Sequence, residues 1–508
     1  MVELATHTPA LQPTPAPIRL SADPAVPGEL VEAARRMIAE QPDRLTWVGS
    51  DDSDVKLVIG DDRPVATWIY AVAAPFYTLT DSISMDDLLT AWQEGRLYLD
   101  QETSLALQAL WGPPASQAAI VGAADLVESL WQIQEEIEDD SLTVLPFHRL
   151  RPQLKVLQLD SQLSVDVEFD PAGYPLAVPI SLVGEPGLVD EVMREWSGPG
   201  TNREDSRITH IAMTGPAGMR RAVADRMERY GLTYPAEETG PVLQAVDIAH
   251  MSNENAFATD CPMPDPFDSD NVCNRDEYVE LMTWMGVDVN EMTGNHLNDW
   301  GAGSLQHTFD LYQELDIKTF GGGRNLEDAR QPLLMEHNGN QIAFVGCNPV
   351  GPEMAWARDD YPGSLPCEDF SFLKEQIAQL HNEGYLVIVT LQYNEDYRYD
   401  PRPEQRELFH DLAEAGASAV SGSHGHHPQG FAFHGDSFIH YGLGNLLADQ
   451  MWSLPTRQTF IDTYLVYDGR LLNIDLWTGL NEDYARIRQM TAEERSDLLE
   501  TVFSVSER

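Results

Sequence analysis

The sequence predicts an α/β fold, because short apolar runs typical of strands alternate with predicted helices and polar clusters follow several of the runs. Residues 68–76 form a continuous apolar run of the kind found in buried strands. With 508 residues, of which 43% are hydrophobic, the chain is long enough for two or three domains with cores of their own.

The first part of the chain contains a helix and several strands by this pattern. A second helix is expected to begin at Ser84, because serine is a good N-cap and Asp86 and Asp87 supply an acidic first turn. The remaining elements expected here are a helix at residues 28–40 and strands at 18–20, 55–59, 68–76, 142–145 and 155–159.

The alternation resumes at residue 208. Asn338-Gly339 is a strong hairpin signal and predicts a strand directly after it. Helices are expected at residues 222–230, 276–285, 304–315, 370–382 and 403–415, and strands at 208–214, 245–251, 287–293, 318–321, 341–346, 386–391, 419–421, 430–434, 437–440 and 464–467.

These elements divide into four segments. A polar stretch at residues 198–205 lacks apolar periodicity and predicts the linker between two domains. We therefore expect a Thr/Pro-rich tether at 1–17, an α/β domain at 18–196, a second α/β domain at 207–480 and a helical tail at 481–508.

Charge excludes some classes of partner. The chain has 82 acidic and 32 basic residues, a net charge of −50, and this surface repels nucleic acid and anionic lipid. It has no apolar run of about 18 residues, so no membrane span is predicted, and no export signal is visible in this chain.

The four cysteines form two close pairs, each enclosing a proline-containing loop. Disulfides Cys261–Cys273 and Cys347–Cys367 are expected in an oxidising compartment, which together with the tether favours an extracellular or cell-surface protein. The alternative is four free thiols in a cytosolic protein.

Polar clusters follow four of the predicted strands, where ligand sites of α/β sheets gather. Glu254, Asn295 and His296 come after two of them, and His424-Gly425-His426 comes after a later one. A carboxylate, an amide oxygen and two imidazoles can hold divalent metal, and the His-Gly-His pair could face two metals. Taken singly, Asn295 could instead be a helix cap beside a histidine whose hydrogen bonds are satisfied, and His424-Gly425-His426 could be a polar turn.

In their order along the chain, these motifs resemble the CapA family, a capsule or poly-γ-glutamate synthesis branch of the calcineurin-like metallophosphoesterase superfamily. The residues are Asn253-Glu254, Gly294-Asn295-His296-Leu297-Asn298-Asp299-Trp300-Gly301, Ser423-His424-Gly425-His426 and Tyr441-Gly442-Leu443-Gly444-Asn445. The resemblance implies a two-sheet sandwich flanked by helices. Residues 68–95 and 145–152 resemble type 2 periplasmic binding proteins.

Two departures from the family pattern stand out. Pro216 occupies the position of a bridging aspartate, and Gln392 that of a histidine ligand. The resemblance therefore implies at most one tightly bound divalent metal (Zn, Mn or Fe), possibly none, held by Glu254, His424 and His426. Asn295 would lie beside the metal as a further ligand.

The expected function is that of an extracellular CapA-like protein acting on a capsule or polyglutamate-type envelope polymer or its precursor. If the protein is catalytic, it would be a metal-dependent hydrolase or transferase in which His296, with Asn295 beside it, steadies the developing anion. The alternative is a non-catalytic protein that binds an anionic polymer or a phosphate-bearing ligand, for which Arg220, Arg221 and Arg324 could supply local positive charge.

Overall fold

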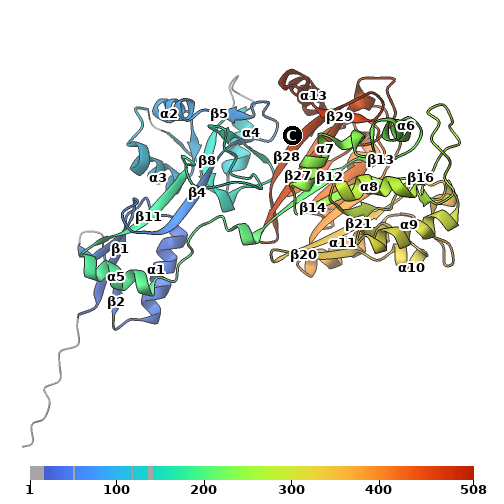
Figure 1. The fold of residues 1–508 in the computed structure, drawn as a ribbon. Coiled ribbons are helices and arrows are strands. Elements are labelled where there is room, and N and C mark those ends of the chain that lie inside the picture. The colour runs from blue at the N-terminus through green and yellow to red at the C-terminus, as the bar shows by residue number, and fades with distance from the viewer. Residues whose placement is uncertain (1–15, 50–51, 117, 135–140, 508) are drawn as a thin grey trace, which may run out of the picture.

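A computed structural model describes residues 16–49, 52–116, 118–134 and 141–507. The predicted α/β class is confirmed, with three main sheets in two halves of the chain (Figure 1). Most of the predicted tether, residues 1–15, lies outside the described residues. Among the described residues, no helix is both long and apolar enough to cross a membrane.

The first half is built on a mixed seven-stranded sheet. Its order is β2-β1-β3-β11-β4-β8, with β9 paired to β4. The strands are β1 (Ile18–Ala22), β2 (Leu45–Trp47), β3 (Val55–Ile59), β4 (Pro64–Pro75), β8 (Thr143–Pro146), β9 (Leu154–Val156) and β11 (Ala177–Gly184). Its helices are α1 (Gly28–Glu40), α2 (Met85–Glu94), α3 (Gln101–Trp111), α4 (Leu126–Gln134) and α5 (Pro186–Glu195). The predicted N-cap of α2 is confirmed, because the Ser84 side chain accepts from the amide of Asp87.

The second half contains two larger sheets. One has the order β18-β17-β14-β12-β27-β28-β29, with β13 paired to β14, and the other has the order β20-β21-β23-β24-β26-β25. The first comprises β12 (Ile208–Thr214), β13 (Pro216–Ala217), β14 (Ile248–Asn253), β17 (Val287–Glu291), β18 (Lys318–Phe320), β27 (Gln458–Tyr467), β28 (Arg470–Glu482) and β29 (Arg486–Gln489). The second comprises β20 (Leu333–His337), β21 (Asn340–Cys347), β23 (Leu386–Gln392), β24 (Ala419–Ser423), β25 (Phe431–His434) and β26 (Ser437–His440).

These two sheets pack face to face, and helices cover their outer faces. Buried residues of both sheets, such as Ile211 and Ile388, share one apolar cluster. A second cluster joins the first sheet to α6 (Arg221–Tyr230), α7 (Thr239–Gln244), α8 (Val279–Trp284) and α9 (Ala302–Glu314), and a third joins the other sheet to α11 (Ser371–Asn382) and α12 (Pro403–Glu414). The expected helix-flanked sandwich is confirmed.

Short elements complete the structure. The predicted hairpin joins β20 to β21, and Asn338 and Gly339 at its turn both have positive φ, as such turns require. The remaining elements are β5 (Ser82–Ile83), β6 (Tyr98–Leu99), β7 (Ala119–Ile120), β10 (Gln158–Leu159), β15 (Phe257–Ala258), β16 (Asn274–Arg275), β19 (Gly322–Gly323), β22 (Gly363–Ser364) and α10 (Leu326–Ala329).

The polar stretch between the halves is more buried than its composition suggests. Asn202 is only 5% exposed, and its amide exchanges two hydrogen bonds with the backbone of Ile69, at 2.7 and 2.9 Å. Arg203 is 6% exposed and donates to the carbonyl oxygens of Ser164 and Asp166. Polar side chains can be buried when the fold supplies partners, so polarity alone did not make this segment an exposed linker.

The end of the chain also differs from the predicted helical tail. Residues 486–489 form β29, the edge strand of the first large sheet. Only α13 (Ala492–Ser504) is helical, and a capping box between Thr491 and Glu494 begins it. Its Val502 and Phe503 belong to the apolar cluster between the two sheets, so α13 is part of the sandwich.

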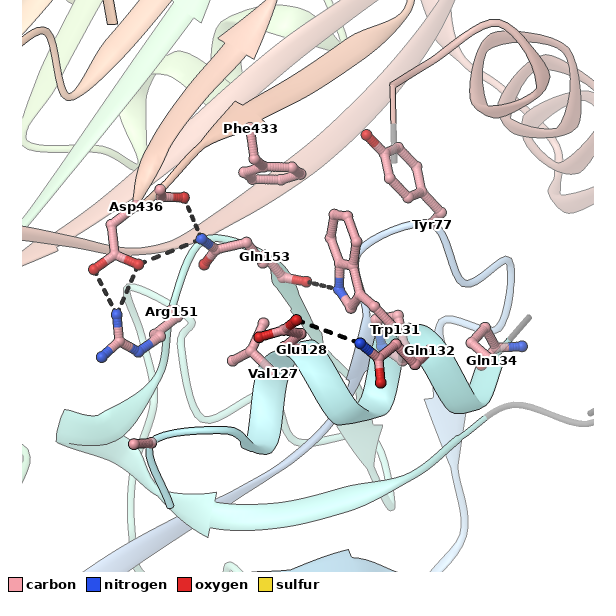
Figure 2. Close-up of a pocket in the computed structure, with 13 residues that line it drawn as sticks. Tyr77, Val127, Glu128, Trp131, Gln132, Gln134, Arg151, Gln153, Phe433 and Asp436 are labelled. Carbon is pink, nitrogen blue, oxygen red and sulfur yellow. Dashed lines mark hydrogen bonds and ion pairs between the residues drawn. The ribbon is translucent and has the colours of Figure 1, made fainter. Parts of the chain in front are cut away.

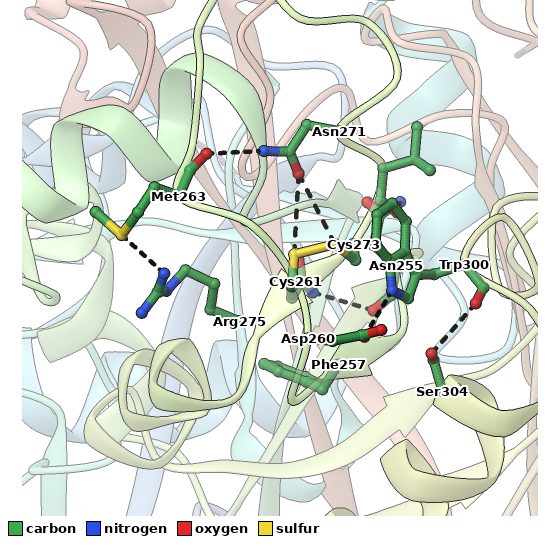
Figure 3. Close-up of a disulfide and its surroundings, with 12 residues drawn as sticks. Asn255, Phe257, Asp260, Cys261, Met263, Asn271, Cys273, Arg275, Trp300 and Ser304 are labelled. Atoms are coloured by element: carbon green, nitrogen blue, oxygen red, sulfur yellow. Dashed lines mark hydrogen bonds between the residues drawn. A yellow bond between two sulfur atoms is a disulfide. The ribbon is translucent and has the colours of Figure 1, made fainter.

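Both predicted disulfides are confirmed. Cys261 pairs with Cys273, and Cys347 pairs with Cys367. Figure 3 shows the first of these, with the Asn271 side chain beside both sulfur atoms. The loop that it closes leads into one wall of the cavity described next.

Candidate functional site

Four of the five predicted site residues line one cavity at the carboxyl ends of strands from both large sheets, and the fifth, Asn295, lies beside it. Glu254 follows β14, Asn295 and His296 follow β17, and His424 and His426 follow β24. The cavity has a volume of about 350 Å³, and Glu254 and the three histidines line it. Strands of one sheet that run parallel end at the same edge, which explains how distant sequence clusters converge.

Glu254 lies at the innermost part of this set. It is 5% exposed, and its Oε1 accepts a hydrogen bond of 2.7 Å from Nε2 of Gln392. Burial raises the pKa of the Glu254 carboxyl, but the nearby histidines and the Gln392 amide outweigh burial and hold it below its ordinary value. Glu254 is therefore a buried carboxylate that its neighbours keep ionised.

Gln392 ends β23 and connects three clusters. Its Nε2 donates to Glu254 and, at 3.2 Å, to Oδ1 of Asn295, while its Oε1 accepts from the hydroxyl of Ser423 at 3.0 Å. The partners fix the orientation of the amide, because the nitrogen can only donate and the oxygen can only accept. An amide N–H₂ group thus faces two oxygens that the sequence predicted as metal ligands.

His424 and His426 each have one ring nitrogen held by an acceptor. Nδ1 of His424 lies 2.9 Å from the carbonyl oxygen of Tyr393, and Nδ1 of His426 lies 2.6 Å from Oδ1 of Asn445. These oxygens accept, so both Nδ1 atoms carry the proton and each Nε2 is left with a free lone pair when the ring is neutral.

The backbone at both histidines is unusual. His424 has φ +77° and His426 has φ +54°, a left-handed conformation that costs non-glycine residues free energy and that clusters at functional sites. The loop after β26 contacts this turn, because Oδ1 of Asn445 accepts from His426. The same loop packs closely on Gly215, where a Cβ would lie 1.9 Å from the carbonyl oxygen of Gly444.

His296 occupies another part of the cavity wall. Its Nδ1 lies 2.6 Å from Oδ2 of Asp299 on the next turn of the loop, which orients the ring as a carboxylate orients many functional imidazoles. Asn295 contacts the Gln392 amide instead of the open cavity. The five predicted site residues are thus brought together, although Asn295 does not belong to the cavity lining.

The arrangement does not fit a divalent metal as it stands. Among the residues that the structure describes, no group of three or more His, Cys, Asp or Glu side chains is placed to hold one. The cause is visible at Glu254 and Asn295, whose oxygens face the N–H₂ group of Gln392. Pro216, which is buried in β13, adds no ligand atom. The predicted metal ligands therefore stay a prediction.

Two of the three arginines named from the sequence line the cavity. Arg221 pairs with Asp449 at 2.7 Å, whereas Arg220 has no hydrogen-bond or ion-pair partner within the described part of the chain. Arg324 does not line this cavity and pairs with Asp310 on α9. Local positive charge at the site therefore comes from Arg220 and Arg221.

Comparison with known proteins matches residues 210–450 to the family described as bacterial capsule synthesis protein PGA_cap. This part of the chain belongs to that family. The capsule biosynthesis protein CapA of Bacillus anthracis is 27% identical over 281 residues, which span 54% of this chain and 68% of that protein. The PGA biosynthesis protein CapA of Bacillus subtilis is 23% identical over 279 residues, 54% of this chain and 73% of that protein.

The N-terminal part resembles periplasmic binding proteins. A possible phosphate binding protein from Planctomyces limnophilus is 12% identical, and the match covers 32% of this chain and 80% of that one with a TM-score of 0.25. A separate match, which extends beyond the N-terminal part, is the NAD nucleotidase of Haemophilus influenzae. It is 9% identical, and the match covers 59% of this chain and 57% of that one with a TM-score of 0.31.

Two aromatic residues that line the cavity of Glu254 and the histidines, called the PGA_cap cavity below, were not predicted from the sequence. Tyr397 stacks on the His426 ring at 5.9 Å between centroids, and Trp452 contacts Tyr397. They are 42% and 66% exposed. The signal in the sequence is a tryptophan between two predicted strands, because large apolar side chains are more often found in the core.

A second cavity lies between the PGA_cap sandwich and α4 of the first half (Figure 2). It has a volume of about 570 Å³, and Tyr77, Trp131 and Phe433 form part of its wall. Arg151 pairs with Asp436 across it at 2.6 Å. None of the predicted site residues lines it, so the sequence motifs point to the smaller cavity.

Proposed function

We propose that this chain acts outside the cell in the synthesis of a capsule or polyglutamate-type envelope polymer, and that the smaller cavity is where it engages the polymer or its precursor. The observation that carries the proposal is the convergence of Glu254, His296, His424 and His426 on this cavity within the PGA_cap region. Two relatives named for capsule and PGA biosynthesis support the polymer class.

Of the two modes of action, ligand binding has the stronger support. The amide of Gln392 donates hydrogen bonds to the oxygens of Glu254 and Asn295. A metal would have to break these hydrogen bonds before the two oxygens could bind it. A hydrogen-bonded buried carboxylate gives up such contacts at a cost of about 1.5–3 kcal/mol each. Metal-assisted hydrolysis or transfer is the second candidate, favoured by the free Nε2 atoms of His424 and His426.

The extracellular placement rests on the two disulfides. Disulfides persist in oxidising compartments and are rare where thiols are kept reduced. Both bonds close loops of the PGA_cap region. Their presence supports a protein that works beyond the cytoplasm.

The test uses the full chain and purified poly-γ-glutamate. Calorimetry measures binding, and size-exclusion chromatography of the polymer measures cleavage. The test variant carries His424→Ala and His426→Ala, and the control carries His307→Ala, whose imidazole pairs with Asp276 outside the cavity. We expect the double variant to weaken binding about tenfold or more, with the control unchanged.

The outcomes separate the two candidates. Binding without shortening of the polymer supports the binding role, and shortening that requires added divalent metal supports the second candidate. If the wild-type chain neither binds nor shortens the polymer, the proposed function is wrong.

A further inference from the structure

We propose that Arg220 anchors an oxyanion, a carboxylate or a phosphate group, inside the PGA_cap cavity, and that Asn255 accepts a hydrogen bond from a donor beside it. This inference rests on the proposed function for one point only, that the cavity is a ligand site. It adds the chemical class of the bound group and the residues that select it.

The isolation of Arg220 is the first observation. The next helix, α6, carries three further arginines, and each of them pairs with aspartate: Arg221 with Asp449, Arg226 with Asp225 and Asp483, and Arg229 with Asp225. Arg220 immediately precedes this helix and pairs with none of the described residues, in a chain with 82 acidic residues. Its position, not a shortage of anions, leaves it unpaired.

The surroundings of Arg220 make the missing partner costly. The residue is partly buried, and burial, followed by the charge of Arg221, lowers the pKa of its guanidinium more than the nearby charges of Glu254, Asp299 and Asp449 raise it. Arginine stays charged even so, because its ordinary pKa is far above neutrality. A buried cation without a hydrogen-bond partner is unfavourable, and an anionic ligand at this place would supply one.

Asn255 provides the second observation. Its Oδ1 is buried and has no hydrogen-bond partner among the residues that the structure describes, while its Nδ2 donates to the carbonyl oxygen of Val272 at 3.1 Å. Asn255 and Arg220 line the same cavity. An unpaired acceptor near an unpaired cation fits a ligand that carries an oxyanion and an N–H or O–H donor close together.

Gly218 keeps the space between these two side chains open. A Cβ at this position would lie 2.6 Å from Oδ1 of Asn255 and 3.7 Å from Nε of Arg220. Any side chain here would therefore crowd the acceptor and narrow the approach to the guanidinium. The absence of a side chain at 218 preserves a recess in which both groups can reach one ligand.

Two sources of such a ligand exist. An amino-acid residue linked through its side-chain carboxyl carries a free carboxylate and an amide N–H on the same carbon atom, and a protonated phosphate carries an oxyanion and an O–H. Both present the chemistry that Arg220 and Asn255 require. N-acetylglutamate and inorganic phosphate are the matching probes, and glutarate is the carboxylate that lacks the N–H.

The experiment is calorimetric titration of the full chain, freed of metal with EDTA, with each of the three compounds. Arg220→Met and Arg220→Lys are compared with wild type. The control is Arg226→Met, which removes the same charge from α6 at a site paired with Asp225. The midpoint of thermal unfolding of each variant is measured, and we expect Arg220→Met not to lower it, because Arg220 has no partner to lose.

We expect N-acetylglutamate or phosphate to bind the wild type, Arg220→Met to weaken that binding about tenfold or more, and Arg220→Lys to keep part of it. The control should bind as wild type does. Glutarate should bind more weakly than N-acetylglutamate, because it leaves Asn255 unpaired. The compound that binds identifies carboxylate or phosphate as the source.

The inference is overturned if neither N-acetylglutamate nor phosphate binds the wild type, or if Arg226→Met reduces binding as much as Arg220→Met. If the wild-type chain binds a small anion but not the polymer, the proposed function is wrong and the anchoring role of Arg220 is not affected. Polymer binding that Arg220→Met does not change would contradict only the anchoring role.

Discussion

Phe76 joins the two halves of the chain through one apolar cluster. It directly follows β4 of the first half, is 2% exposed, and belongs to the cluster between the two sheets of the second half. Its ring centroid lies 5.4 Å from that of Phe431, 5.2 Å from Phe433 and 5.6 Å from Phe438. The halves therefore share a core, and we expect them to unfold together.

Phe76→Ala should lower the free energy of unfolding by about 3–5 kcal/mol, the range for removing a buried phenylalanine ring. The upper part of this range is expected, because edge-to-face aromatic pairs add about 0.5–1.5 kcal/mol each to the burial of area. Phe76→Leu is the matched control. It keeps most of the apolar volume but loses the three ring pairs, so its cost should be clearly smaller than that of Phe76→Ala.

Urea unfolding of the three proteins, followed by tryptophan fluorescence and by circular dichroism, measures these values. The two probes should report one coincident transition for the wild type, since a shared core couples the halves. Two separated transitions, or a loss below about 1 kcal/mol for Phe76→Ala, would show that the ring does not couple the halves and refute the reasoning.

Three further expectations concern a disulfide, an ion pair and the metal. Replacing Cys347 and Cys367 by serine opens a loop of 20 residues and should lower the free energy of unfolding by about 3 kcal/mol; an unchanged urea midpoint would contradict this. Burial raises the pKa of Asp81, but its hydrogen bonds to Arg495 and the nearby positive charges outweigh burial and hold the pKa at about 2. The stability that this carboxylate contributes is therefore present above its ordinary pKa of 3.8 and is lost as the pH falls toward 2. Arg495→Met should flatten the stability profile across that interval, and a profile that keeps its slope would argue against the pair. Elemental analysis after loading with Zn, Mn or Fe should find at most one equivalent per chain, and Gln392→His should increase metal uptake; two equivalents in the wild type would be incompatible with the blocking role of the glutamine amide.

Strands with an unbroken apolar run could be predicted from the sequence, whereas β28 could not. β23 is buried along its whole length, and residues 386–391 identified it. β28 carries Asn473 among its buried positions. The Asn473 amide donates to the carbonyl oxygen of Leu154, 319 residues earlier, at 3.1 Å. A polar residue interrupts the local pattern, and only a distant partner makes its burial favourable.

The candidate site divides in the same way. Glu254, Asn295, His296, His424 and His426 were predictable because each follows a strand, and strand ends of a parallel sheet collect at one edge. The hydrogen bond from Gln392 to Glu254 was not, although Gln392 had been noted as a departure from the family pattern. The sequence shows that a ligand type is missing but not what the replacement contacts.

The sequence by itself determined the α/β class, the order of the polar clusters and the pairing of the cysteines, because each depends on residues close together in the chain. Only the tertiary structure decided which polar groups are satisfied. Gln392 ends β23 and Glu254, 138 residues earlier, follows β14 of the other sheet, and they meet because the sheets pack face to face. Arg220 is close in the sequence to three paired arginines, but it lines the cavity and forms no ion pair with any residue in the described part of the chain. Hydrogen bonds and ion pairs act over a few ångströms. Which polar groups remain available to a ligand therefore depends on the distances between elements, and the sequence does not give these distances.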